Sequence, residues 1–351
     1  MQERPLRNLQ PISLTPALSR WERVNVSQRW SSGNARGVST RRRSCSLSQR
    51  ERVRVREDAR FVVSTTQFLS RLSALVFGFL LLLLTSTTSA ADLPPFTAGK
   101  STVSFSELPK QAEPDEVKWR LHSVENPAAL DVAKEKFQLI VPASYKHADK
   151  WGVFIWISPS DSPSIPADWE PVLAARKLLF VGAFKSGNPR NIFDRVRLAV
   201  AANAAMRERF NVDGRRVYVS GFSGGGRVAS MVGVAYADMF SGTMPFMGVN
   251  FYEDIPAGDG KTTYGANFIP DEEVLAIAKK FCRYALVTGE KDFNRAGTKT
   301  VFELGFKKEG FANVTYLEAP GVAHNLPPAK WLEQGLDFLD AGKGVKPVEA
   351  K

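Results

Sequence analysis

From about residue 100 onward, short runs of β-branched and aromatic residues alternate with longer amphipathic segments. Strands are predicted at 137–141, 153–157, 178–181, 217–219, 244–251, 285–288 and 314–317. Apolar positions at helical spacing predict helices over 192–210, 227–240, 271–281, 298–310 and 328–339. Strands alternating with helices are typical of a mostly parallel sheet with helices on both faces. The pattern therefore predicts one α/β domain over residues 92–345.

One long connection interrupts this alternation. Residues 252–270 are rich in Gly, Asp and Thr and lie between a predicted strand and a predicted helix. Connections of this length are usually functional lids or disordered. Catalytic groups of such a sheet lie beyond the carboxyl ends of its strands. We therefore expect 252–270 to be a substrate-facing loop.

The first 91 residues have a different pattern. An apolar stretch of about 13 residues, 72–84, follows Arg71 and leads into small residues ending at Ala90 and Ala91. This order predicts a secretory signal peptide over 62–91, cleaved after Ala90 or Ala91. An uncleaved membrane anchor is the alternative, although a span needs about 20 apolar residues. We interpret residues 1–61, rich in Arg and Ser without a sustained period, as a non-native or disordered basic extension.

The positive charge is concentrated in this leader. The whole chain has a net charge of +11, and residues 1–91 carry 15 arginines and 5 acidic residues, a net +10. The body is close to neutral and has no basic stripe of the kind that binds nucleic acid. The expected mature protein is periplasmic or secreted, with no nucleic-acid partner and no membrane partner after signal cleavage. Its oligomeric state stays open.

The cysteine count limits the covalent chemistry of the body. Cys45 lies in the leader and Cys282 begins an apolar run. The body alone therefore cannot form an internal disulfide, and Cys282 is expected to be a buried apolar residue. No cysteine or histidine cluster indicates a metal, and no cofactor is expected.

A nucleophile motif follows the predicted strand at 217–219. Residues 221–225 read Gly-Phe-Ser-Gly-Gly, which matches G-x-S-x-G between a strand and a helix. In that turn both outer positions must be small, and the serine hydroxyl is lifted above the sheet edge. A glycine-rich turn that only binds an anion is the alternative. We predict Ser223 as the nucleophile.

A serine nucleophile needs a base and a group that orients the base. Of the three histidines, only His324 lies between the last predicted strand and the last predicted helix. Asp292 follows the 285–288 strand and is the predicted third member, with Glu290 as the runner-up. Ser, Asp and His then occur in the chain order of α/β-hydrolases.

Two backbone donors are expected to stabilise the oxyanion. The N–H of Gly224, directly after the nucleophile, is the predicted first donor. The second should come from the loop after the 153–157 strand. Pro159 has no N–H, so Ser160 is predicted; an ordinary turn at 158–161 is the alternative.

Residues from about 135 to 340 resemble the α/β-hydrolase superfamily, in particular secreted esterases grouped with polyhydroxybutyrate depolymerases and feruloyl or acetylxylan esterases. The resemblance is carried by the segments 210–213, 217–226, 289–292 and 321–324. It implies an α/β-hydrolase fold and ester hydrolysis. The chain departs from these esterases at Ser158-Pro159, where they usually have His-Gly, and in lacking their disulfides.

These observations predict an exported serine hydrolase that cleaves carboxylic esters through an acyl-enzyme. A small or polymeric ester is the expected substrate, but neither its acyl group nor its alcohol is indicated. A serine peptidase of related fold is one alternative, although peptidases of that kind usually carry a large propeller or cap. A catalytically inactive hydrolase-fold binding protein is the other, and the altered loop after Ile157 favours it.

Overall fold

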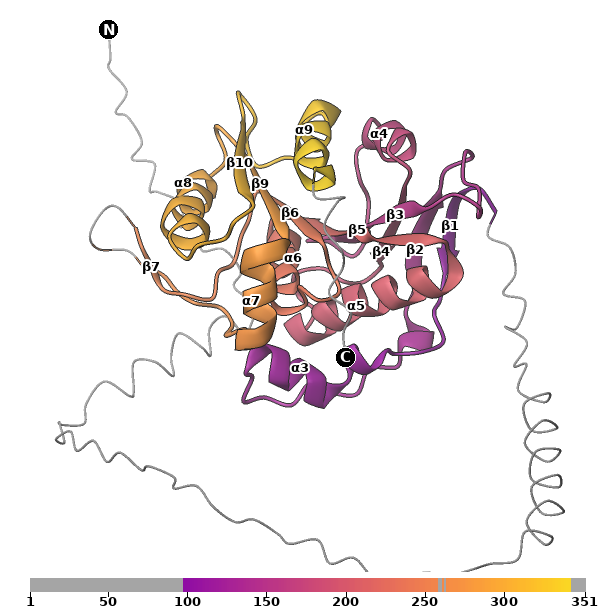
Figure 1. Ribbon diagram of the computed structural model, residues 1–351, viewed down its shortest axis with the longest axis horizontal. Coiled ribbons are helices and arrows are strands. Elements are labelled where there is room, and N and C mark those ends of the chain that lie inside the picture. Colours follow the sequence, from indigo (N-terminus) through magenta and orange to yellow (C-terminus); the bar gives the residue numbers. More distant parts are fainter. Residues whose placement is uncertain (1–96, 258–260, 262, 342–351) are drawn as a thin grey trace, which may run out of the picture. The chain divides into compact units, whose positions relative to one another are not determined.

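The computed structural model describes residues 97–257, 261 and 263–341. The predictions for the extension 1–61 and the signal peptide 62–91 lie outside these residues. Within them, eight strands form one sheet in the order β1-β2-β4-β3-β5-β6-β9-β10 (Figure 1). The strands are β1 Gly99–Val103, β2 Phe137–Val141, β3 Trp151–Ile157, β4 Leu178–Ala183, β5 Val212–Phe222, β6 Gly242–Phe246, β9 Arg283–Gly289 and β10 Val314–Ala319.

The sheet is parallel from β4 to β10, and β2 runs antiparallel to both of its neighbours. Every residue of β3 and β4 is buried. A strand covered on both faces must be apolar without alternation, which explains the continuous run Trp151–Ile157. The mostly parallel sheet with helices on both faces and a Gly-x-Ser-x-Gly turn after β5 is the α/β-hydrolase architecture. The predicted fold class is confirmed.

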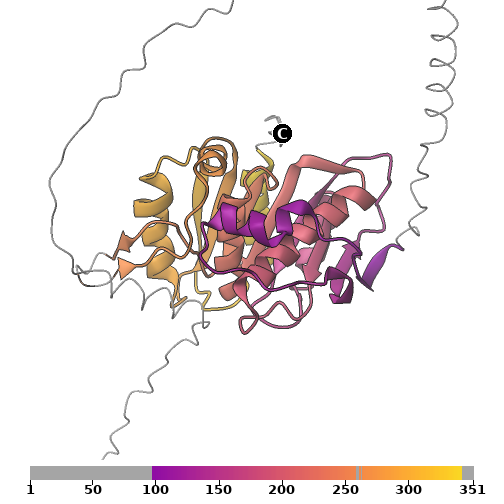
Figure 2. The same ribbon diagram turned by 90° about the horizontal axis from the view of Figure 1, so that it is seen from below.

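Two helical layers cover the sheet (Figures 1 and 2). One layer contains α4 Trp169–Ala175 and α9 Ala329–Asp340, whose buried side chains share an apolar cluster with Phe154 and Phe246. The second layer packs on the opposite face of the sheet, where a larger apolar cluster contains buried side chains of α3, α5, α6 and α7. These helices are α3 Pro114–Leu121, α5 Ile192–Arg209, α6 Gly224–Ala235 and α7 Glu272–Phe281.

Some predicted boundaries are wrong for local reasons. The strand predicted over 244–251 ends at Phe246, because Met247 adopts a φ of 55°. The helix predicted to start at residue 227 starts at Gly224, directly after the nucleophile turn. The helix predicted over 298–310 is α8 Arg295–Thr300 continued by a π-helical segment, Val301–Lys307. The sequence pattern predicts neither the strand β1 nor the helices α3 and α4.

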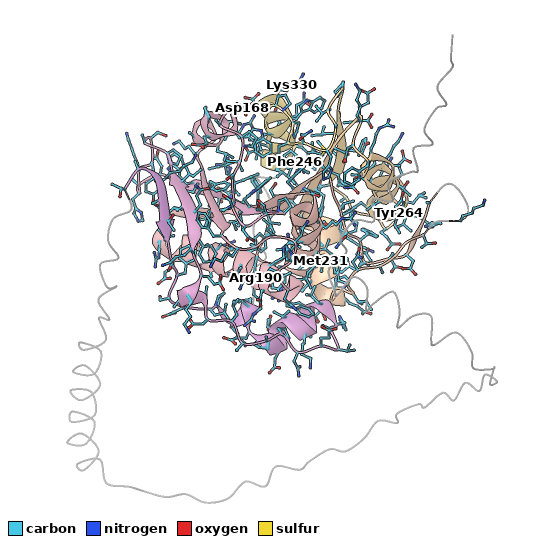
Figure 3. The ribbon with its side chains drawn as sticks, turned by 180° about the vertical axis from the view of Figure 1, so that it is seen from behind. Asp168, Arg190, Met231, Phe246, Tyr264 and Lys330 are labelled. Carbon is cyan, nitrogen blue, oxygen red and sulfur yellow. The ribbon has the colours of Figure 1, made fainter. Side chains whose placement is uncertain are left out.

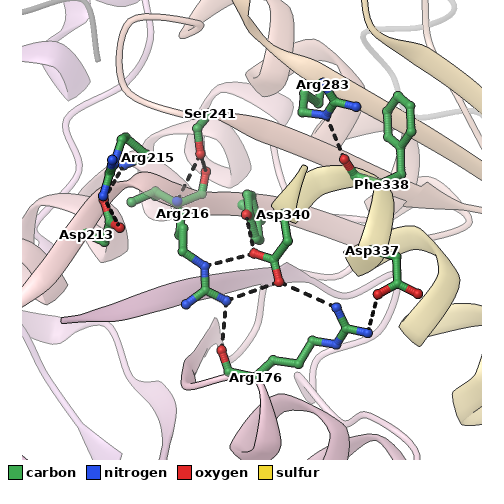
Figure 4. A network of polar contacts seen from close by, with 11 residues as sticks. Arg176, Asp213, Arg215, Arg216, Ser241, Arg283, Asp337, Phe338 and Asp340 are labelled. Carbon is green, nitrogen blue, oxygen red and sulfur yellow. Dashed lines mark hydrogen bonds and ion pairs between the residues drawn. The ribbon is translucent and has the colours of Figure 1, made fainter. Parts of the chain in front are cut away.

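Hydrogen bonds and ion pairs join α9 to α4 and to β5. The Asp168 carboxylate at the start of α4 accepts a hydrogen bond from the Ala329 N–H, so the first turns of the two helices lie together (Figure 3). At the other end, Asp340 accepts from the Arg216 guanidinium at 2.8 Å and from the Tyr218 hydroxyl at 2.9 Å (Figure 4). Arg176 adds a contact to Asp337 at 2.6 Å. The Arg216–Asp340 ion pair is largely buried, so removing one partner would leave the other charge buried and unpaired, which is costly.

Cys282 is buried, with 3% of its surface exposed, and its thiol donates to the carbonyl oxygens of Ala237 and Phe240. Burial raises the pKa of the Cys282 thiol to about 12. The prediction of a buried small apolar residue is confirmed. Among the helices that the structure describes, none combines the length and apolarity that a bilayer crossing needs.

Candidate active site

Ser223 occupies a sharp turn between β5 and α6. Its backbone has φ 53° and ψ −119°, a conformation that L-residues rarely adopt. The Ser223 N–H donates to Phe246 O at 2.8 Å, and Ser223 O accepts from the Arg227 N–H at 3.0 Å. The turn is therefore fixed from both sides, and the serine side chain stands at the carboxyl edge of the sheet.

The two outer glycines of the motif permit this turn. A Cβ added at Gly221 would lie 2.5 Å from Gly225 O and 2.5 Å from Ile157 O. A Cβ at Gly225 would overlap the same Ile157 carbonyl. The steric reason given for small residues at both positions therefore holds in this structure.

Ser223, His324 and Asp292 form one hydrogen-bonded chain. His324 Nε2 lies 2.9 Å from Ser223 Oγ, and His324 Nδ1 lies 2.7 Å from Asp292 Oδ1. A carboxylate accepts only, so Nδ1 donates to Asp292 and Nε2 is left to accept the serine proton. The imidazole lies against Phe222 and Phe293, with ring centroids 5.0 and 4.1 Å away.

The Asp292 carboxylate is fully buried and held by other donors. Oδ2 accepts from the Thr288 hydroxyl at 3.0 Å, and Oδ1 accepts from the Asn294 N–H at 3.1 Å. These bonds fix the direction in which the carboxylate faces His324. The runner-up, Glu290, is exposed and instead accepts from the Gly321 N–H at 2.6 Å.

Backbone bonds join the loop of the acid to the loop of the base. The Lys291 N–H donates to Val322 O, and the Glu290 N–H donates to Ala319 O, both at 2.9 Å. His324 lies in the connection from β10 to α9, as the sequence predicts. The other histidines lie elsewhere: His122 Nδ1 is near Ile269 O, and His147 Nδ1 is near the Tyr145 hydroxyl.

The two predicted oxyanion donors differ in availability. Within the described part of the chain, the Gly224 N–H has no hydrogen-bond partner. The Ser160 N–H donates to Ser158 Oγ at 3.1 Å, so this donor is already engaged. The assignment of Ser160 stays a prediction, and this bond argues against it.

Asn188, which no motif in the sequence marks, has its carboxamide directly against Gly224. A Cβ on Gly224 would overlap Asn188 Oδ1 and would lie 2.7 Å from Cγ and 2.9 Å from Nδ2. The side chain is exposed, and in the described residues it makes no hydrogen bond. An amide with two unused N–H groups therefore lies beside the nucleophile turn.

A backbone hydrogen bond positions Asn188, and Arg195 joins the two loops on either side of that bond. The Asn188 N–H donates to Pro159 O at 2.9 Å. The buried Arg195 guanidinium donates to Ser186 O at 2.9 Å and to Ser158 O at 3.1 Å. The loops after β3 and β4 are therefore bound to each other. The turn residues Ser-Gly-Asn-Pro at 186–189 are the signal that would have directed attention to this strand end.

The predicted substrate-facing loop borders a cavity beside the triad. Its strands β7 Ile255–Pro256 and β8 Thr263–Tyr264 pair antiparallel. Tyr264 lies beside α8: a Cβ added at Gly297 would be 3.1 Å from Tyr264 Cε1 (Figure 3). The cavity is about 340 Å³, and its lining includes Tyr264 and Phe293, the aromatic neighbour of His324. No group of three or more His, Cys, Asp or Glu side chains suited to a metal occurs in the described residues.

No protein-family model matches the chain, and no curated protein matches it significantly. Among solved structures, it is similar to Est1E from Butyrivibrio proteoclasticus, with 16% identity and a TM-score of 0.45 over 62% of this chain and 98% of that one. It is also similar to S-formylglutathione hydrolase (FrmB) from Staphylococcus aureus, with 11% identity and a TM-score of 0.43 over 71% and 97%. A third similar structure is a dipeptidyl aminopeptidase IV from Bacteroides ovatus, described as putative. It has 13% sequence identity and a TM-score of 0.46, over 70% of this chain and 36% of that one.

Proposed function

We propose that the protein is an exported serine hydrolase that cleaves carboxylic esters through an acyl-enzyme. The observation that carries the proposal is the hydrogen-bonded chain from Ser223 through His324 to Asp292. Nucleophile, base and orienting acid are each within hydrogen-bond reach of the next, which is the arrangement that activates a serine hydroxyl. Export rests on the apolar segment and small-residue exit at 72–91 alone.

The reaction follows from the positions of these atoms. Ser223 Oγ attacks the acyl carbon while His324 Nε2 takes the hydroxyl proton, and the carbonyl oxygen becomes an oxyanion. The imidazolium then gives that proton to the departing alkoxide, which leaves an acyl-serine and an alcohol. A water molecule attacks the acyl-serine while His324 takes its proton, and the imidazolium then returns a proton to Ser223 Oγ as the carboxylic acid leaves. Asp292 stabilises the imidazolium in both steps.

The oxyanion is assigned two donors, the Gly224 N–H and the Asn188 carboxamide. Both are free of other partners in the described residues, and the Asn188 carboxamide lies against Gly224, the residue that follows Ser223. Rotation about the terminal torsion exchanges Oδ1 and Nδ2, so a developing negative charge selects the orientation with Nδ2 facing it. A side-chain donor would take the place of the second backbone donor at Ser158-Pro159.

We expect Asn188→Ala to lower kcat for a short p-nitrophenyl ester by about 10²–10³-fold with little change in KM, because the lost donor acts mainly on the transition state. Asn188→Asp should be at least as damaging, since a carboxylate cannot donate and repels the oxyanion. Steady-state kinetics and thermal unfolding of both variants measure this. A kcat within threefold of wild type in Asn188→Ala, with an unchanged melting temperature, would remove Asn188 from the mechanism.

The proposed function itself is tested by labelling with a fluorophosphonate, which reacts with activated serines. We expect one phosphonyl group per chain at Ser223, located by mass spectrometry, together with hydrolysis of short p-nitrophenyl esters. A protein that neither labels nor hydrolyses esters would instead be the inactive binding protein. Labelling with faster cleavage of peptide than of ester substrates would favour the peptidase.

A further inference from the structure

The cavity beside the triad is lined by apolar, aromatic and uncharged polar side chains and by Arg227. In the described residues, Arg227 is the charged member of this lining. Phe251, Tyr264 and Phe293 supply aromatic surface, and Asn267 and Asn294 supply amides. The lining therefore combines aromatic surface with amides and one charged group, and a pocket with a few placed polar groups is the usual form of a small-molecule site.

The Arg227 guanidinium has no acidic partner in the described part of the chain. Its hydrogen bond there is to the neutral Asn294 Oδ1, at 3.3 Å. The side chain is half-buried. Withdrawing a guanidinium from water without an opposite charge is unfavourable, and an arriving anion would compensate for it. Elsewhere, the half-buried Arg190 and the buried Arg216 are paired with carboxylates, whereas the half-buried Arg283 donates to Phe338 O and Asn313 Oδ1.

The cavity is lined by residues that themselves contact Ser223 and His324. Arg227 is one helical turn after Ser223, and its N–H donates to Ser223 O. On the other side, Phe293 contacts the His324 ring, and Asn294 directly follows Phe293. A group bound at Arg227 would therefore be part of the same molecule whose ester bond meets Ser223.

We propose that this cavity is a binding subsite for a carboxylate, and that Arg227 selects esters that carry one on an apolar or aromatic group. The inference rests on the proposed function, because it places the subsite beside a working nucleophile. The guanidinium would hold the carboxylate through paired N–H donors, and the aromatic side chains would enclose the apolar part.

Calorimetric binding of 3-phenylpropanoate and of the neutral 3-phenylpropanamide tests the subsite without any turnover. Wild-type protein should bind the carboxylate about tenfold or more tightly than the amide, a preference that falls as salt is raised. Arg227→Gln should abolish the preference. Arg227→Lys should retain part of it, because lysine keeps the positive charge but lacks the paired N–H donors of the guanidinium. The matched control is Arg215→Gln on β5, because Arg215 has 39% of its side chain exposed, pairs with Asp213 and lies outside the cavity lining; this variant should keep the full preference.

Equal affinity of wild type for the acid and the amide would overturn the proposal, and so would an undiminished preference in Arg227→Gln. If Arg227→Gln fails to fold, Arg227→Lys decides the matter, and an undiminished preference in that variant would also overturn the proposal. Failure of fluorophosphonate labelling would instead contradict the proposed function. The two failures are therefore distinguishable, because binding of the carboxylate does not require an active serine.

Discussion

Replacing Ser223 by alanine is expected to reduce hydrolysis of short p-nitrophenyl esters by at least about 10⁴-fold. The hydroxyl is the atom that forms the acyl-enzyme, and the described residues offer no second hydroxyl hydrogen-bonded to His324. Folding stability should stay nearly unchanged, because alanine meets the same backbone strain at φ 53° as serine does. Initial rates and melting temperatures of purified wild type and variant provide the measurement.

Ser123→Ala is the matched control, since Ser123 is a half-buried serine after α3 and lies outside the triad. It should retain wild-type rates. If Ser223→Ala kept more than about a tenth of the activity in a correctly folded protein, the assignment of the nucleophile would be wrong.

Asp292→Asn should lower activity by about 10⁴-fold, the loss known for the equivalent change in a protease triad. An amide at this position can donate to His324 Nδ1 and so trap the tautomer in which Nε2 carries the proton. That tautomer cannot accept the proton of Ser223. Rates on one ester substrate, with circular dichroism to check folding, measure the effect.

Glu290→Gln is the comparison that makes this result specific. Glu290 lies two residues away on the same turn, but it accepts a hydrogen bond from the Gly321 N–H rather than from His324. Glutamine retains a carbonyl oxygen for that bond, so the rate should change by a few-fold at most. A crippled Glu290→Gln beside a nearly normal Asp292→Asn would transfer the orienting role to Glu290.

The sequence predicted the central strands and the three-residue hydrogen-bonded chain because both depend on local signals. Continuous apolar runs predict buried parallel strands, and the Gly-x-Ser-x-Gly turn dictates its own geometry. His324 and Asp292 could be assigned from their order after β10 and β9, since parallel strands bring their carboxyl ends to one edge.

Other parts depend on contacts between distant segments and have no local signature. Among the described strands, β1 pairs only with β2, and its five residues include Lys, Ser and Thr, so no apolar run marks it. Asn188 acquires its place from a bond to Pro159 and from Arg195, which binds two loops at once. The cavity is formed by β8, α6 and the turn after β9 together. None of these can be read from the spacing of residues within one segment.

The fastening of α9 by Asp340 has a consequence for the order in which the protein becomes active during synthesis. Ser223 is made 101 residues before His324, an interval of about 5–20 s at ordinary translation rates of about 5–20 residues per second. His324 lies in the connection between β10 and α9, and α9 is anchored by Asp340 at its very end. A nascent chain can therefore form the nucleophile turn early, yet it has no base for Ser223 until the helix that follows His324 has been completed and docked.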